Sequence, residues 1–188
     1  VCISPTRFFI EEPVYDEFIK SFKSHVEAIN VGDGLDSKST MGPLVADRRL
    51  EVMEDFISDA ISSGGEVISG GGRGQSPGSF FEPTLIRDVP DTAKIMIEEP
   101  FGPVAPSASF SSIDEIIERA NSLPFGLASY AFTSNPRTSQ ILKSEIESGM
   151  LAINSMHIHS VETPFGGLKH SGYAVSYTHL RAHETSYD

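Results

Sequence analysis

Val1-Cys2-Ile3-Ser4-Pro5-Thr6-Arg7 opens the chain and contains its only cysteine. One cysteine cannot form a disulfide within the chain, and it is too few for a metal site built from thiolates. Cys2 is therefore either a buried, unreactive thiol or a nucleophile. Its small and turn-forming neighbours, Ser4 and Pro5, are typical of a backbone that exposes a side chain, which favours the nucleophile.

The sequence that follows alternates between strand and helix patterns. Arg7–Ile10 predicts a short buried strand, and the apolar residues of Val14–Ile29 recur at helical spacing. Strands that alternate with helices of about ten residues predict a parallel α/β sheet. The other predicted helices cover residues 46–62, 113–122 and 136–147, and the other predicted strands cover residues 66–69, 80–86, 104–110, 128–133 and 150–154.

Short polar residues mark the expected helix starts. Ser111 or Ser112 is predicted to cap the helix that begins at residue 113. Ser134 or Asn135 is predicted to cap the next one, with Pro136 in its first turn.

A glycine-rich run, Gly70-Gly71-Gly72-Arg73-Gly74, invites comparison with a phosphate-binding loop. It lacks the Gly-Lys-Ser/Thr ending of such loops, and Gln75-Ser76-Pro77-Gly78 follows it instead of a helix pattern. We therefore expect a surface turn.

Acidic residues dominate the charge. The chain of 188 residues carries 26 Asp and Glu against 14 Lys and Arg, a net charge of −12. Such a charge opposes binding to nucleic acid and to anionic membranes. The sequence has no apolar run of the roughly 20 residues that a membrane span needs and no signal peptide, so a cytoplasmic location is expected. It begins at Val1 without a methionine, which we interpret as the mark of a fragment.

Four motifs occur in a fixed order: Cys2-Ile3-Ser4-Pro5-Thr6-Arg7, Met41-Gly42-Pro43-Leu44, Glu98-Glu99-Pro100-Phe101-Gly102-Pro103-Val104 and Pro164-Phe165-Gly166-Gly167-Leu168-Lys169-His170-Ser171-Gly172. Together they resemble the C-terminal half of an NAD(P)-dependent aldehyde dehydrogenase, over about residues 1–173. The resemblance implies a three-layer, parallel-sheet α/β catalytic domain of this type, truncated at its N-terminal side.

The same resemblance implies the roles of individual residues. Cys2 would attack the aldehyde carbon, and the reaction would pass through a thiohemiacetal and a thioester to a carboxylic acid, with NAD or NADP as cofactor. Glu99 would bind the hydroxyls of the nicotinamide ribose, and Phe101 would pack beside the nicotinamide. Phe165 would form a wall of the aldehyde tunnel. Without the motifs, Glu98 and Glu99 would be an ordinary solvated pair, and the two phenylalanines would be core residues.

Other parts of the family's machinery lie before the cysteine and are not in this sequence. They are an Asn that donates to the oxyanion, a Glu that acts as the hydrolytic base, and the dinucleotide-binding half with its glycine turn. We therefore expect the fragment to be inactive alone, and the complete protein to be a homo-oligomer. The choice between NAD and NADP stays open because the ribose-discriminating residues belong to that half.

Two stretches point to a substrate class. Gly126-Leu127-Ala128-Ser129-Tyr130 and Ser160-Val161-Glu162-Thr163-Pro164-Phe165 resemble the succinate-semialdehyde branch of the family. In that branch a serine at the position of Ser160 helps to hold the distal carboxylate of the substrate. A small semialdehyde such as succinate semialdehyde is therefore the expected substrate.

Two other readings stay open. Cys2 could serve a hydrolase or acyltransferase with a histidine base, which would place His25, His157, His159 or His170 within hydrogen-bond reach of the sulfur. Alternatively, the piece could be a packing module without chemistry. His157 and His159 alternate, but no acidic or cysteine partner accompanies them, so we predict no metal site.

The end of the chain departs from this pattern. Residues 175–185 show no core periodicity and resemble the translation of a sequencing adapter. We therefore expect a catalytic domain over residues 1–173 and a non-native tail over residues 174–188.

Overall fold

The computed structural model describes residues 1–160 and 162–172. The chain forms two compact units. The four-strand unit comprises Thr6–Ser111, and the cysteine unit combines Val1–Pro5 with the chain from Ser112 onward. The predicted tail lies outside the described residues.

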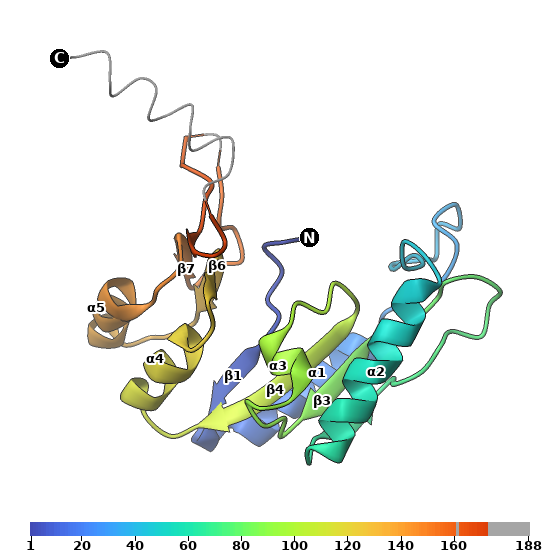
Figure 1. Cartoon of the computed structure of the whole chain (residues 1–188), viewed down its shortest axis with the longest axis horizontal. Helices are drawn as coiled ribbons and strands as arrows, with labels where there is room; N and C mark the ends of the chain where they lie inside the picture. Colours follow the sequence, from blue (N-terminus) through green and yellow to red (C-terminus); the bar gives the residue numbers. More distant parts are fainter. Residues whose placement is uncertain (161, 173–188) are drawn as a thin grey trace. The chain divides into compact units, whose positions relative to one another are not determined.

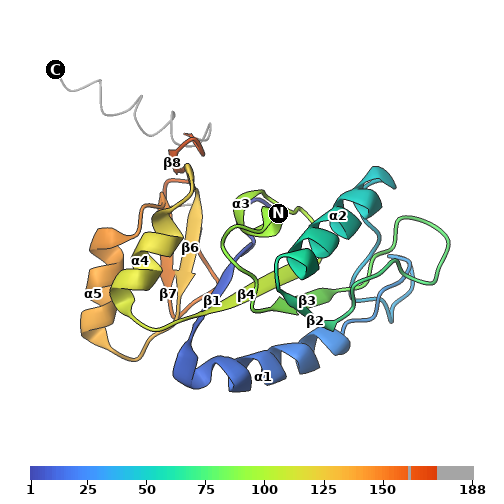
Figure 2. The same ribbon diagram turned by 60° about the horizontal axis from the view of Figure 1, so that its bottom comes forward.

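The four-strand unit is built on a sheet in the order β1-β4-β3-β2 (Figures 1 and 2). Strand β1 (Phe8–Glu11) pairs in parallel with β4 (Val104–Phe110), which pairs in parallel with β3 (Thr84–Arg87). Strand β2 (Glu66–Ser69) runs antiparallel to β3 at the edge. The sheet is thus mixed, with the predicted parallel pairing in its interior.

Helices cover both faces of this sheet (Figure 2). On one face lies α1 (Tyr15–Glu27), which follows a short 3₁₀ turn, η1 (Glu12–Val14). On the other face lie α2 (Arg48–Ser62) and α3 (Lys94–Ile97). Successive side chains of a strand point to opposite faces. Leu85 accordingly packs in the α1 cluster and Ile86 in the α2 cluster, which confirms the three-layer arrangement.

The antiparallel edge was not predicted, although the sequence carried the signal for it. A parallel connection needs a crossover, usually a helix, whereas no helix pattern lies between β2 and β3. The predicted strand over residues 80–86 also begins later, at Thr84, because Pro83 has no N–H to donate to a ladder. Helix α3 was missed because its four residues are too few to show a period.

The glycine-rich run forms the loop after β2, as expected, and no helix follows it before β3. Gly70 has a φ of 70°, and a Cβ there would lie 2.2 Å from the Pro83 carbonyl oxygen. Only glycine fits so close to the returning strand. The run therefore serves the geometry of the β2–β3 connection.

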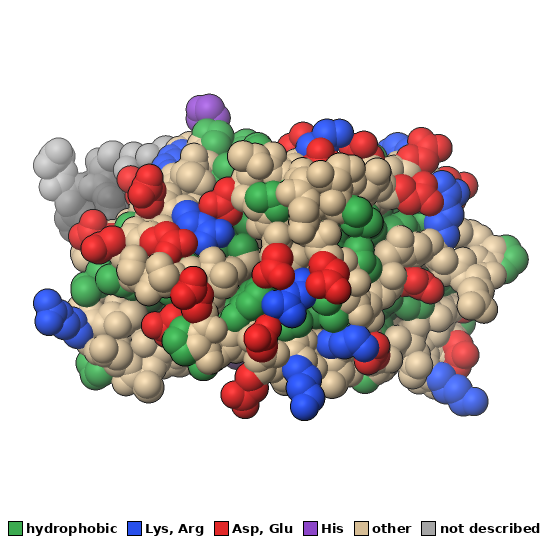
Figure 3. All heavy atoms as spheres, turned by 90° about the horizontal axis from the view of Figure 1, so that it is seen from below, with side chains coloured by type: hydrophobic (Ala, Val, Ile, Leu, Met, Phe, Trp, Pro, Cys, Tyr) green, Lys and Arg blue, Asp and Glu red, His purple; other side chains and the backbone are tan. Residues whose placement is uncertain are grey.

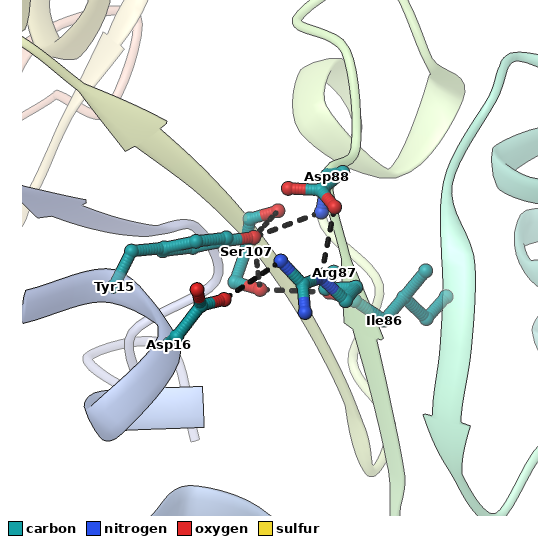
Figure 4. Close-up of polar contacts among 6 residues, drawn as sticks. All are labelled: Tyr15, Asp16, Ile86, Arg87, Asp88 and Ser107. Atoms are coloured by element: carbon teal, nitrogen blue, oxygen red, sulfur yellow. Dashed lines mark hydrogen bonds and ion pairs between the residues drawn. The ribbon is translucent and has the colours of Figure 1, made fainter. Parts of the chain in front are cut away.

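A buried tyrosine joins α1 to the sheet (Figure 4). The Tyr15 hydroxyl accepts a hydrogen bond from the Asp88 backbone N–H at 2.9 Å and lies 3.3 Å from the Ser107 hydroxyl. Ser107 in turn donates to the Ile86 carbonyl at 2.9 Å. Arg87 lies over the Tyr15 ring, 5.3 Å from its centroid, and forms ion pairs with Asp16 and Asp88.

We predict that Tyr15→Phe destabilises the four-strand unit by about 1–3 kcal/mol, because the Asp88 N–H loses its acceptor. Burial raises the pKa of Tyr15, so the neutral phenol is favoured in the folded state. The stabilisation from the Tyr15 hydroxyl is therefore complete below its ordinary, unfolded-state pKa near 10. It is lost as the pH rises through the higher pKa of the folded state. Urea unfolding at pH 7 and pH 11 should show the two proteins converging at high pH. Equal stability at pH 7 would contradict this role.

The cysteine unit holds the remaining elements. Helices α4 (Ile113–Asn121) and α5 (Pro136–Glu145) lie beside the parallel pair of β6 (Ala128–Ala131) and β7 (Met150–Ile153) (Figures 1 and 2). A short antiparallel pair joins β5 (Phe125–Gly126) to β8 (Leu168–Lys169).

Both predicted helix caps in this unit are confirmed. The Ser112 side chain accepts a hydrogen bond from the Glu115 N–H at 3.2 Å, and the Asn135 side chain accepts from the Arg137 N–H at 2.9 Å. Each satisfies a backbone donor that the first turn of a helix leaves without a partner.

Residues 164–172 form a tight loop against the start of β7. A Cβ on Gly149 would lie 2.0 Å from the Gly166 carbonyl oxygen, and the Gly167 N–H donates to the Gly172 carbonyl at 2.8 Å. The Lys169 ammonium donates to the carbonyls of Asn121 and Leu123. The close backbone contact and these hydrogen bonds therefore hold residues 164–172 in place.

One face of the molecule carries side chains of both charge signs. In the view from below, acidic and basic side chains are interspersed rather than gathered into one field (Figure 3). Over the residues that the structure describes, no helix is both long enough and apolar enough to cross a membrane.

Candidate active site

Cys2 lies at the centre of a turn. The Ser4 N–H donates to the Val1 carbonyl oxygen at 3.1 Å, so Cys2 and Ile3 occupy the two central positions. The thiol is free and exposed. The thiol is therefore not buried in the described part of this chain, and its role as a nucleophile stays a prediction.

A tyrosine from β6 holds this turn. The Tyr130 hydroxyl donates to the Ile3 carbonyl oxygen at 2.7 Å. Burial raises the pKa of Tyr130, and the nearby Cys2 raises it further because a thiolate would repel a phenolate. The phenol thus stays protonated and able to donate at neutral pH. Tyr130 ends the stretch Gly126–Tyr130 that resembles the succinate-semialdehyde branch, but nothing in the sequence indicated its contact with Ile3.

The candidate substrate residues lie on the loop after β7. Ser160 is exposed, and its hydroxyl accepts from the Glu162 N–H at 3.3 Å and lies 3.4 Å from the Thr163 hydroxyl. A hydrogen bond from Ser160 lowers the pKa of Glu162. Phe165 is half-buried, and its ring meets the edge of His159 with the centroids 6.2 Å apart. The Ser160 hydroxyl is therefore accessible, although it already has a carboxylate beside it.

The candidate cofactor residues lie on the loop between α3 and β4. Glu99 is exposed, and Phe101 is 54% exposed with a φ of 41°. A positive φ is rare for a residue with a bulky side chain and costs about 1–3 kcal/mol, and such strain is concentrated at functional sites. Phe101 is thus not the core residue of the alternative reading.

Residues of helix α2 contact the backbone of this loop and support it. The Arg49 guanidinium donates to the Pro100 carbonyl oxygen. A Cβ on Gly102 would lie 2.1 Å from the Met53 sulfur, so the backbone touches the helix directly. The sequence did not reveal this support, because contacts between residues some fifty positions apart leave no local pattern.

The five predicted site residues fall into two groups. Cys2, Ser160 and Phe165 belong to the cysteine unit, whereas Glu99 and Phe101 belong to the four-strand unit. Their convergence on one catalytic site stays a prediction.

The histidines do not support a hydrolase. Within residues 1–160 and 162–172, no hydrogen bond reaches the Cys2 sulfur. His25 bonds to the Ser21 carbonyl through Nδ1, while His159 and His170 stack edge-on against phenylalanines. No group of three or more potential metal ligands is present in the described part of the chain.

A sequence profile described as the aldehyde dehydrogenase family matches residues 1–186. The chain belongs to this family. The match extends past residue 173, where the motif resemblance ended. The profile confirms the resemblance drawn from the four motifs, and with it the catalytic-domain fold.

Individual aldehyde dehydrogenases resemble the chain over most of its length. A 4-(hydroxymethyl)benzenesulfonate dehydrogenase from Comamonas testosteroni is 39% identical, covering 92% of this chain and 36% of the relative. The mitochondrial succinate-semialdehyde dehydrogenase of Rattus norvegicus is 37% identical, and the match covers 91% of this chain and 33% of that enzyme. The crystal structure of succinate-semialdehyde dehydrogenase from Burkholderia pseudomallei matches with a TM-score of 0.90 at 35% identity, covering 94% and 37%. The chain thus spans about a third of the length of these relatives.

Proposed function

We propose that this chain supplies the nucleophile of an NAD(P)-dependent aldehyde dehydrogenase that oxidises a small semialdehyde to the acid. The observation that carries the proposal is the exposed Cys2 thiol at the centre of its turn, within the family's cysteine motif. The activity belongs to the longer protein of which this sequence would form the catalytic part.

Cys2 performs the covalent step. Its thiolate attacks the aldehyde carbon to give a thiohemiacetal, and the Cys2 backbone N–H can donate to the developing oxyanion. Free cysteine has a pKa of about 8.5, so only a few per cent is thiolate at neutral pH without help from its surroundings. After oxidation, the acyl group is held as a thioester on the same sulfur until water releases it.

Glu99 and Phe101 fit one end of a nicotinamide cofactor. An exposed carboxylate can accept two hydrogen bonds from a ribose diol, and an exposed ring can limit where a flat heterocycle sits. A nicotinamide held there would supply the hydride acceptor for the thiohemiacetal carbon. The hydrogen bond from Arg49 to the Pro100 carbonyl supports this loop, which would lower the cost of ordering it when the cofactor binds.

Ser160 and Phe165 account for the substrate. The exposed Ser160 hydroxyl can donate to the distal carboxylate of a semialdehyde, and Phe165 shields the reacting carbon from water. Ser160 lowers the pKa of Glu162, which favours the charged carboxylate near this hydroxyl, and that charge would repel a second carboxylate. A semialdehyde with a distal carboxylate would therefore meet a negative charge near Ser160, whereas a neutral aldehyde would not be repelled.

We predict that Ser160→Ala in the full-length enzyme raises the KM for succinate semialdehyde by about three- to tenfold, the effect of one lost hydrogen bond. The KM for a neutral aldehyde such as butanal should change less than twofold. Ser155→Ala is the matched control, since the Ser155 hydroxyl bonds to the backbone of His157 and to no other described residue. Steady-state assays of reduced cofactor provide the measurement. Equal changes for both aldehydes would refute the assignment of Ser160.

A further inference from the structure

We propose that Tyr130 is the residue that positions the nucleophile, by fastening the Cys2 turn to the strand β6. The inference rests on the proposed function, since it assigns Tyr130 a role in a reaction performed by Cys2. It concerns a positioning residue, because the hydroxyl meets the Ile3 backbone and not the reacting atoms.

The turn has few other attachments. In the described part of the chain, residues 1–5 take part in two hydrogen bonds. One closes the turn on itself, from the Ser4 N–H to the Val1 carbonyl. The other is the 2.7 Å bond from the Tyr130 hydroxyl. Among the described residues, Tyr130 is therefore the one that joins the turn to the rest of the cysteine unit by a hydrogen bond.

Tyr130 projects from a strand that is paired with β7 along its length. Tyr130 pairs in register with Ala152 of β7, and Ala152 is buried at 7% exposure. The neighbouring pairs, Ser129 with Leu151 and Ala131 with Ile153, continue the parallel ladder on both sides. A side chain that projects from a paired strand has a fixed origin, so its hydroxyl can hold a carbonyl at one place.

The hydrogen bond from Tyr130 restrains the backbone directly beside the nucleophile. Ile3 follows the nucleophile directly, and its carbonyl belongs to the peptide that leads to Ser4. Fixing that carbonyl restrains the rotation of the Ile3–Ser4 peptide, and through the closed turn it restrains the backbone of Cys2. A nucleophile placed even about 1 Å away from its productive position can lose about 10² in rate.

The first test uses the 188-residue chain. Tyr130→Phe keeps the ring and removes only the hydroxyl, and Tyr15→Phe is the same change in the four-strand unit. Amide relaxation should show the Ser4 order parameter falling from about 0.85 to below about 0.6 in Tyr130→Phe, with residues 150–153 unchanged. Tyr15→Phe should leave Ser4 rigid. An unchanged Ser4, or unfolding of the whole cysteine unit, would overturn the proposal.

The second test uses the full-length enzyme. Tyr130→Phe should lower kcat by about three- to tenfold and leave the KM for the cofactor unchanged. Damage to the structure of the site would instead raise the KM values for both the aldehyde and the cofactor. Tyr15→Phe should keep the wild-type kcat. If Cys2→Ser abolishes turnover but Tyr130→Phe does not lower kcat, the positioning role fails while the proposed function stands. If Cys2→Ser retains turnover, the proposed function itself fails.

Discussion

Replacing Cys2 by serine in the full-length enzyme is expected to lower dehydrogenase turnover by more than about 10³-fold and to leave cofactor binding nearly intact. Removing the nucleophile of a covalent mechanism typically costs several powers of ten. A serine hydroxyl is a far weaker nucleophile at neutral pH than a thiol with a small thiolate fraction. Serine keeps the size of the side chain, so the turn closed by the Val1 and Ser4 backbones should persist.

Two measurements separate loss of chemistry from loss of fold. Steady-state production of reduced cofactor reports the turnover, and titration of the cofactor against protein fluorescence reports its affinity. Ser4→Ala is a matched control, because it changes the same turn and spares the thiol; it should stay within a few-fold of the parent. Turnover of Cys2→Ser close to that of the parent would remove Cys2 from the mechanism.

The main elements of the fold followed from local patterns. Helical spacing predicted α1 and α2, and cap and first-turn residues marked α4 and α5. The two N-caps were found because one short polar side chain satisfies a known backbone donor. The antiparallel pairing of β2 was missed because strand direction depends on the connection and not on the strand itself. The division into two units also escaped prediction, since it depends on which distant segments pack together.

The candidate site divides in the same way. Cys2, Glu99, Phe101, Ser160 and Phe165 were named through their motifs. The residues that support them, Tyr130 beneath the Cys2 turn and Arg49 beneath the Phe101 loop, contact their targets across 127 and 51 positions of sequence. The strained φ of Phe101 is equally invisible in the sequence, because its neighbour Gly102 would have been the natural choice for a positive φ.

The 188-residue chain by itself is expected not to oxidise aldehydes, even at high concentrations of NAD or NADP. It spans about a third of its relatives, and only Val1 precedes the nucleophile in this sequence. The family resemblance places an oxyanion-binding Asn, a hydrolytic Glu and the dinucleotide-binding half before the cysteine. Loss of one oxyanion donor alone lowers the rate by about 10²–10³.

Loss of the dinucleotide-binding half should have a larger effect than any substitution, because it removes most of the site for the hydride acceptor. Glu99 and Phe101 can contact only one end of a dinucleotide, and Cys2 would be left with an aldehyde that it can bind covalently but cannot oxidise. The purified chain, supplied with succinate semialdehyde and either cofactor, should produce no reduced nicotinamide by absorbance. Mass spectrometry of the same sample under native conditions, without reduction, should still detect the thiohemiacetal on Cys2. Turnover that persists in the chain and vanishes in its Cys2→Ser variant would show instead that this part of the enzyme is catalytically sufficient.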